Sequence, residues 1–294
     1  MSRRAAVWLV IATAVLFSTG GAAIKLTQLG AWQVAGGRAA VAAIAILLLA
    51  PGSRRGWNWR TLMVGAAYAA TVLLYVHSNK LTTAAATIFL QSTAPLFVIL
   101  LSPLLVGETP RRRDLLFAPA FALGLALCFL DRTGATTTAP QPMLGNALAL
   151  AGGLTYGLTL LGLRALGRPP EPAAMEPRVG EGRAGNPGLA AVACGNVIAA
   201  VVSLPWALPV HEISSTDVGV LLFLGVFQIG LAYALMTRAL RHLTAVEGAL
   251  LLLFEPVLNP LWAALLLGEL PGPWTSAGGM VLVGATAYKA WSEP

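Results

Sequence analysis

A carboxylate, an amide and an indole follow one another at helical spacing near the end of the chain. Glu255, Asn259 and Trp262 lie four and then three residues apart, so one helix face would carry all three. They stand inside an apolar run, and an ionised carboxylate in the middle of a lipid bilayer costs about 3 kcal/mol. Glu255 must therefore be paired, hydrated or protonated. It is either a coupling site or partner for a substrate ammonium, or a partner for a basic residue on a neighbouring helix.

Two earlier apolar runs, residues 60–77 and 84–106, carry polar faces of the same kind. Polar groups that face lipid are costly, so these faces should point inward and could line a substrate site. Hydrogen bonding between helices is the alternative, above all for single Ser and Thr residues. The candidate substrate-binding residues on these faces are Tyr68, Tyr75, His77, Ser78, Asn79, Thr87, Gln91 and Ser92. The rings of Tyr68, Tyr75, Phe89 and Trp262 could stack on an aromatic substrate.

Two prolines stand at matching positions near the middle of apolar runs. Pro95 and Pro256 each remove a backbone hydrogen bond and should break the helix, which frees the carbonyl groups of Gln91 and Leu252. Paired helix breaks in a duplicated membrane protein indicate a substrate site at mid-membrane with a gating role. A purely structural kink is the alternative.

Three basic residues lie near the ends of expected helices on one side. Each of them could extend its charge to the membrane surface or attract a substrate carboxylate, and for Lys25 and Arg38 we expect the first. Lys80 adjoins the polar face that ends at Asn79, so it could instead attract a substrate carboxylate.

The composition is that of a membrane protein. Of 294 residues 57% are hydrophobic and 11% charged, against about 25% charged in soluble domains. Because a span needs about 20 apolar residues, we expect an all-α membrane protein with ten transmembrane helices. The expected spans are 7–26, 34–50, 60–77, 84–106, 114–131, 144–166, 188–209, 217–237, 246–267 and 274–291.

Other function classes lack their motifs. The net charge of +7 fits basic cytoplasmic loops, and no basic run interleaved with aromatics predicts nucleic-acid binding. The two cysteines have no metal or disulfide spacing. His211-Glu212 lacks a second histidine, and no nucleophile elbow, Walker A or dinucleotide motif is present. We therefore expect no enzyme, no cofactor and no metal, and transport driven by an ion or substrate gradient.

The distribution of basic residues predicts the orientation. With the N-terminus inside, only Lys25, Arg38, Lys80 and Arg132 of the 19 Lys and Arg residues fall on the outer side. Both termini would then be cytoplasmic in a multi-pass protein of the cytoplasmic (inner) membrane. A cleaved signal peptide is the alternative for the N-terminus, but its apolar run is long and no clear cleavage site ends it.

One stretch of the sequence is written twice. Residues 95–110 and 256–271 share Pro, Gly, Glu and Pro at the same offsets, which indicates an internal duplication. Arginines follow the first copy only, so the copies should face opposite sides of the membrane. We expect two inverted five-helix repeats, residues 1–139 and 140–294, around a central cavity, with an inner loop at 167–187. Glu108 and Glu269 would shape the hairpin turns.

These pieces together resemble a known family. Ala22-Ala-Ile-Lys25, then Gly37-Arg38-Ala-Ala, then the two Pro…Gly-Glu spans, are similar to the EamA repeat of the drug/metabolite transporter superfamily. The overall likeness is greatest to its aromatic amino-acid exporters. The resemblance implies a ten-helix inverted-repeat carrier that works by alternating access, usually in efflux.

The expected function is therefore a secondary transporter that exports small metabolites, with amino acids, aromatic ones included, as its substrates. A passive channel or facilitator, or an exporter of other metabolites or drugs, is the alternative. The expected partners are the substrate and the lipid bilayer, with the protein working as a monomer.

Overall fold

The computed structural model describes residues 2–105, 107, 118–130, 135–167, 186–210, 212–239, 252 and 254–292. Within these residues the chain forms helices and no strands. The first group is α1 (Arg3–Ser18), α2 (Gly20–Leu26), α3 (Ala31–Leu49), η1 (Pro51–Arg54), α4 (Trp59–Leu81), α5 (Ala84–Gln91), α6 (Ala94–Leu105) and α8 (Ala118–Leu130). The second is α9 (Pro142–Gly167), α10 (Pro187–Ala207), α11 (Ser215–Leu222), η3 (Phe223–Leu231), α12 (Ala232–Ala239), α14 (Phe254–Leu267) and α15 (Pro273–Ser292).

Seven segments of the described chain are long and apolar enough to cross a membrane. They are Arg3–Leu26, Ala31–Leu49, Trp59–Leu81, Ala84–Leu105, Pro142–Gly167, Pro187–Ala207 and Ser215–Met236. The expected all-α membrane protein is confirmed at this level. The spans expected at 114–131, 246–267 and 274–291 fall on α8, α14 and α15, which are not among the seven. The count of ten therefore stays a prediction.

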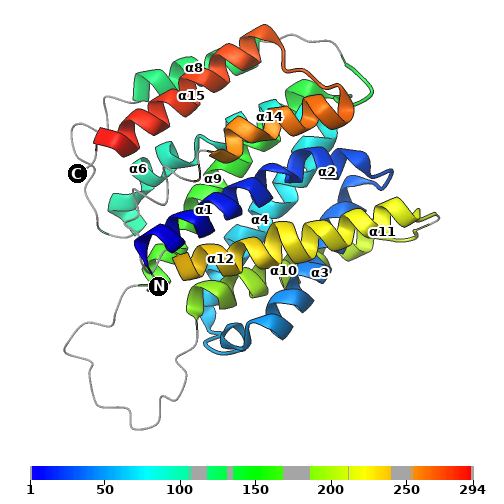
Figure 1. Ribbon diagram of the computed structural model, residues 1–294, viewed down its shortest axis with the longest axis vertical. Coiled ribbons are helices and arrows are strands. Elements are labelled where there is room, and N and C mark those ends of the chain that lie inside the picture. The colour runs from blue at the N-terminus through cyan, green and yellow to red at the C-terminus, as the bar shows by residue number, and fades with distance from the viewer. Residues whose placement is uncertain are drawn as a thin grey trace.

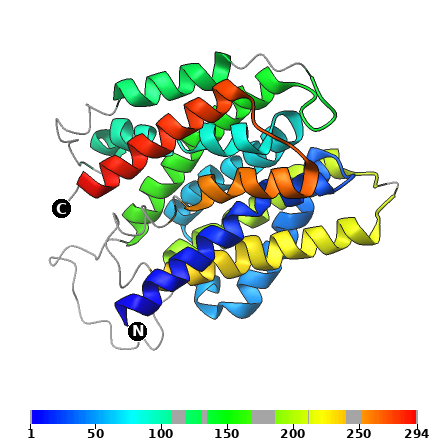
Figure 2. The same ribbon diagram turned by 45° about the horizontal axis from the view of Figure 1, so that its top comes forward.

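Helices from the two halves of the chain alternate through the bundle (Figure 1). In contact are α1 with α12, α3 with α10, α4 with α9, α5 with α14 and α8 with α15. The first helix begins and the last ends at the same end of the bundle, in both Figure 1 and Figure 2. Both halves of the chain therefore contribute helices that pack against one another throughout the bundle.

Three of the seven apolar segments are interrupted inside the bundle. The first breaks at Thr19, between α1 and α2, and the fourth at Ser92 and Thr93, between α5 and α6. The break at Ser92 and Thr93 agrees with the prediction from Pro95, which stands in the first turn of α6. The segment that begins at Ser215 passes through a π-helix, η3, and π segments are frequent at functional sites.

The second proline stands in a different local setting. Pro256 is buried on α14, whose described part begins at Phe254, and Leu252 before it is also helical. Residues 251 and 253 lie outside the described part of the chain. The predicted release of the Leu252 carbonyl group therefore stays a prediction.

Both copies of the repeated motif end their helices on a glycine with a positive φ. The φ angles are 68° at Gly107 and 64° at Gly268, a backbone conformation that other residues adopt only with strain. These glycines terminate α6 and α14. Glu108 lies outside the described residues.

The break between α5 and α6 packs closely against α9. A Cβ atom at Gly153 would lie 2.5 Å from Thr93 Oγ1 and 3.1 Å from the Leu90 carbonyl oxygen. Only a glycine lets the two backbones come this close. The interruption is therefore held between helices in the interior of the bundle.

Candidate functional site

An arginine and three tyrosines form the aromatic part of an interior cluster. Arg38, on α3, is only 3% exposed, and its guanidinium carbon lies 5.6 Å from the centre of the Tyr75 ring. Tyr68 and Tyr233 are also close enough to act electrostatically on its charge. The rings of Tyr68 and Tyr233 meet edge to face, with centroids 5.5 Å apart. Helices α4 and α12 thus place aromatic rings near the buried cation that α3 carries.

Three amides and a phenol converge on the start of α2. A Cβ atom at Gly20 would lie 2.8 Å from the Gln228 side-chain nitrogen and 3.3 Å from the Tyr75 hydroxyl. One at Gly21 would lie 3.0 Å from the side chains of Asn79 and Asn259. These residues come from α4, η3 and α14, so three helices aim polar groups at one double glycine. With Arg38, Tyr68, Tyr233 and Asn196 they make up what we call the interior cluster.

The interior cluster holds buried polar atoms without hydrogen-bond partners. Asn79 donates to the Tyr75 carbonyl oxygen at 2.9 Å, Asn196 to the Tyr68 hydroxyl at 3.2 Å, and Asn259 to the Tyr75 hydroxyl at 3.5 Å. Within the described chain, the atoms of the cluster left without partners are Asn79 Oδ1, Asn196 Oδ1, Asn259 Oδ1, Gln228 Oε1, Arg38 Nε and Arg38 Nη1.

Such atoms are costly, because a buried polar group without a partner loses about 1–3 kcal/mol of hydration. Native structures contain few of them, and each calls for a physical reason. The cluster offers amide carbonyl oxygens that accept hydrogen bonds and two N–H groups of one guanidinium that donate them. A ligand with complementary groups would satisfy both.

A carboxylate completes the surroundings of the cluster. Glu255 is half-buried in the first turn of α14. Its carboxyl group is within electrostatic range of Tyr75, Tyr156 and Tyr233. Tyr75 and Tyr233 are also within range of Arg38, so the same two tyrosines neighbour one acidic and one basic side chain.

The structure brings together some of the sequence-predicted residues. Tyr68, Tyr75, Asn79 and Asn259 belong to the interior cluster, and Glu255 acts on its tyrosines. Trp262 is half-buried and donates from Nε1 to the Ser18 hydroxyl at 2.9 Å, beside the break between α1 and α2.

The remaining predicted residues make local or interhelical contacts. Ser78 and Thr87 share a hydrogen bond of 2.8 Å that joins α4 to α5, and Ser92 donates to the Ile88 carbonyl oxygen at 2.7 Å. His77 lies edge-on to the ring of Trp32, at 4.3 Å. Gln91 is half-buried at the end of α5, next to the helix break.

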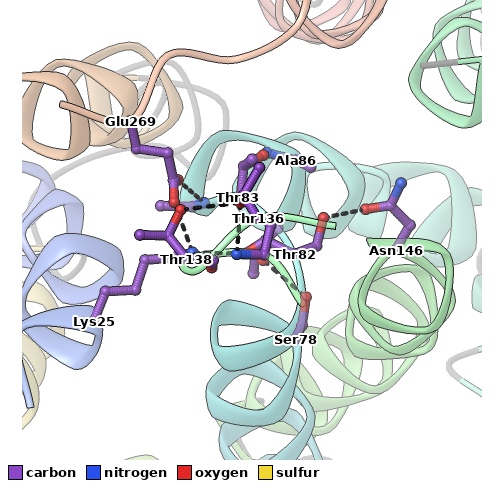
Figure 3. Close-up of polar contacts among 12 residues, drawn as sticks. Lys25, Ser78, Thr82, Thr83, Ala86, Thr136, Thr138, Asn146 and Glu269 are labelled. Atoms are coloured by element: carbon purple, nitrogen blue, oxygen red, sulfur yellow. Dashed lines mark hydrogen bonds and ion pairs between the residues drawn. The ribbon is translucent and has the colours of Figure 1, made fainter. Parts of the chain in front are cut away.

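A second polar group, which we call the end cluster, lies at the end of the bundle away from the chain termini (Figure 3). Lys25 Nζ lies 2.7 Å from a Glu269 oxygen and donates to the carbonyl oxygens of Thr82, at 2.8 Å, and Thr138. The other Glu269 oxygen accepts from the Ala84 N–H at 2.6 Å, at the start of α5. Both side chains of the ion pair are less than 5% exposed. These contacts join α2, α4, α5 and the end of α14.

The expected surface position of two basic side chains is wrong. Lys25 and Arg38 do not extend to the surface, because other helices cover both side chains. Lys80 donates to the Thr27 carbonyl and hydroxyl oxygens at 2.8 and 3.0 Å, so its ammonium connects α4 to the chain after α2. Glu269 does more than shape its turn, since it pairs with Lys25 and accepts from Ala84.

Sequence reasoning missed three members of the interior cluster, Asn196, Gln228 and Tyr233, and it favoured a surface position for Arg38. Asn196 and Gln228 are single amides inside long apolar runs, which is the signal that could have found them. Two hollows in the described part of the molecule lie elsewhere, beside Thr61 and beside Gln28. The central cavity therefore stays a prediction, and the cluster itself is closely packed.

Comparisons with known proteins agree with this architecture. The model of the EamA-like transporter family matches residues 4–130 and 181–288. The uncharacterized protein PA1977 of Pseudomonas aeruginosa is 33% identical over 195 residues, which cover 64% of this chain and 58% of that protein, so the match spans little more than half of the relative's length. A crystal structure described only as that of a protein superposes with a TM-score of 0.61, over 97% of this chain and 98% of its own, at 18% identity. At that identity the superposition shows a shared fold and nothing about function.

Proposed function

Because this chain belongs to the EamA-like transporter family, we propose that it is a secondary transporter that exports amino acids, aromatic ones included. It is a multi-pass membrane protein, and the family moves small solutes. We further propose that it resides in the cytoplasmic membrane with both termini inside, and that it works by alternating access. Coupling to an ion gradient or to the substrate gradient follows from the absence of an ATP-binding motif in the sequence.

The observation that carries the proposal is the set of buried acceptor oxygens in the interior cluster. The side-chain oxygens of Asn79, Asn259 and Gln228 have no partners in the described chain, and they come from three helices around Gly20 and Gly21. An ammonium group has three donors and matches such a set of acceptors. Glu255, once ionised beside the ammonium group, would add the opposite charge.

The aromatic rings support a preference for apolar or aromatic side chains. Tyr75 and Tyr233 are within electrostatic range of both Arg38 and Glu255, and Phe17 packs against Tyr233 with ring centroids 5.2 Å apart. Offset or edge-on contact with an aromatic substrate would add about 0.5–1.5 kcal/mol beyond burial.

Alternating access requires that one end of the site be closed while the other opens. The end cluster supports this, because the Lys25–Glu269 pair and the Ala84 contact tie α2, α4, α5 and α14 together at one end. The two family-matched stretches, and the pairing of α1 with α12 and of α4 with α9, support the inverted repeat. An inverted repeat brings such helix pairs into related positions.

A passive facilitator is the second candidate, and countertransport separates the two. Proteoliposomes preloaded with unlabelled L-phenylalanine should accumulate labelled L-phenylalanine faster than empty ones, because a carrier returns loaded more readily than empty. Uptake that ignores the preload would contradict the carrier. Tyr75→Ala and Gln91→Ala should impair this exchange while the protein still inserts into the membrane. Full exchange in both variants would remove these residues from the site.

A further inference from the structure

A buried arginine with free donors calls for an anion. Arg38 is 3% exposed, and its Nε and Nη1 groups have no hydrogen-bond partners within the described chain. Buried charges in proteins are paired with a counter-charge or held by hydrogen bonds. Among the described residues, a buried ion pair joins Lys25 to Glu269, and Arg38 takes no part in it. Within the described chain the Arg38 guanidinium lies over the Tyr75 ring, with Tyr68 and Tyr233 in electrostatic range.

The tyrosines make a poor permanent counter-charge. Tyr68, Tyr75 and Tyr233 are buried phenols, which are neutral at physiological pH. The π face of Tyr75 attracts the guanidinium, but it does not accept hydrogen bonds from the N–H groups that point outward in the guanidinium plane. The planar donors of arginine match a carboxylate in a two-point contact, and this is the geometry in which arginine binds anions best.

We propose that Arg38 binds the carboxylate of the transported molecule, so that the site selects small molecules with a free carboxylate beside an apolar or aromatic group. This rests on the proposed transport function and gives its substrate class. The substrate carboxylate would bind Arg38 beside the three tyrosines of the interior cluster. The substrate ammonium group would bind Glu255 and the amide oxygens. Neutral sugars and purely cationic amines would leave the two Arg38 donors unpaired and would bind weakly.

The test compares an acid with its amide, which removes the negative charge and little else. In proteoliposomes, unlabelled L-phenylalanine should compete against labelled L-phenylalanine about 10- to 100-fold better than L-phenylalaninamide, the ratio expected for one charged hydrogen-bonded contact. Arg38→Gln should bring this ratio close to one. Arg60→Gln is the matched control, because Arg60 lies at the same 5.6 Å from an aromatic ring, that of Trp59, but is exposed. The control should keep the wild-type ratio.

A second measurement needs no transport. In detergent, 3-phenylpropionate should raise the unfolding temperature of the wild-type protein and of Arg60→Gln more than 3-phenylpropionamide does, at matched ionic strength. Arg38→Gln should lose this difference. Arg38→Met fills similar space without charge and serves in its place if the glutamine variant does not fold.

The outcomes separate the two proposals. If phenylalanine is not transported but the carboxylate stabilises the protein through Arg38, the site stands and the amino-acid function falls. If phenylalanine is transported and a folded Arg38 variant still prefers the acid, the function stands and the role of Arg38 falls. A wild-type protein that does not distinguish acid from amide in either measurement overturns the Arg38 site without any variant.

Discussion

Lys25 and Arg38 are two basic residues with buried side chains and different surroundings. The side chain of Lys25 is 3% exposed and Arg38 as a whole residue is 3% exposed, yet Lys25 has a carboxylate and two carbonyl oxygens, whereas two Arg38 donors have no partner in the described chain. The end cluster is thus a completed set of bonds and the interior cluster an incomplete one. The contrast teaches that burial alone does not mark a site. Unmet hydrogen-bonding capacity at a buried charge is what sets the candidate site apart.

The largest expected effect tests that contrast on stability. Lys25→Met leaves the Glu269 charge buried and unpaired, so the free energy of unfolding should fall by about 3–5 kcal/mol. Arg38→Met removes a charge that has no protein partner, so it should cost far less or stabilise the protein. Chemical unfolding in detergent measures both.

The double variant Lys25→Met with Glu269→Leu provides the control. An apolar pair of similar volume should restore most of the stability lost in the single variant. Equal losses for Lys25→Met and Arg38→Met would mean that the two charges are held alike, and the contrast between the clusters would fail.

A smaller effect is expected from a matched pair of asparagines. The Asn146 side-chain oxygen accepts from the Thr82 hydroxyl at 2.8 Å beside the end cluster, whereas the Asn259 oxygen has no partner in the described chain. Asn146→Leu should lower the free energy of unfolding by about 1–3 kcal/mol, because the buried Thr82 hydroxyl loses its acceptor. Asn259→Leu should cost less and should abolish exchange of phenylalanine. If Asn259→Leu lowered the free energy of unfolding more than Asn146→Leu does, the Asn259 oxygen would not be the unpaired one, and the contrast between the two clusters would fail.

The smallest effect concerns Ser78 and Thr87, which the sequence places among the candidate substrate residues. Their hydroxyls bond to each other at 2.8 Å, so we expect a structural role. A double-mutant cycle with Ser78→Ala and Thr87→Val should give a coupling of about 0.6 kcal/mol, typical of hydrogen bonds inside membrane proteins. Exchange should continue in both variants, and its loss in either would return these residues to the substrate site.

Local patterns in the sequence predicted the parts of the site that depend on one helix. Tyr68, Tyr75 and Asn79 share a face of a single apolar helix, so the need to turn away from lipid already places them inside. Pro95 likewise determines where its own segment breaks, and that break is found at Ser92 and Thr93.

Contacts between distant segments could not be predicted in this way. Lys25 and Glu269 are 244 positions apart, and only the packing of α2 against α14 brings them together. Arg38 stands near a helix end in the sequence, where a charge would normally reach water. Its burial depends on the packing of α3 against α4, α10 and η3, which lie in other parts of the chain. A single sequence contains no signal for either event.

The π-helix at Phe223–Leu231 has a mechanical consequence. A π turn holds an additional residue compared with an α turn, and each α-helical residue turns the chain by about 100° and advances it by about 1.5 Å. If η3 tightened into a regular α-helix, the residues on one side of it would rotate relative to those on the other. The orientation of Gln228 relative to Gly20 would then change. A change between π and α turns would in this way alter which polar group faces the double glycine, without unfolding of a helix.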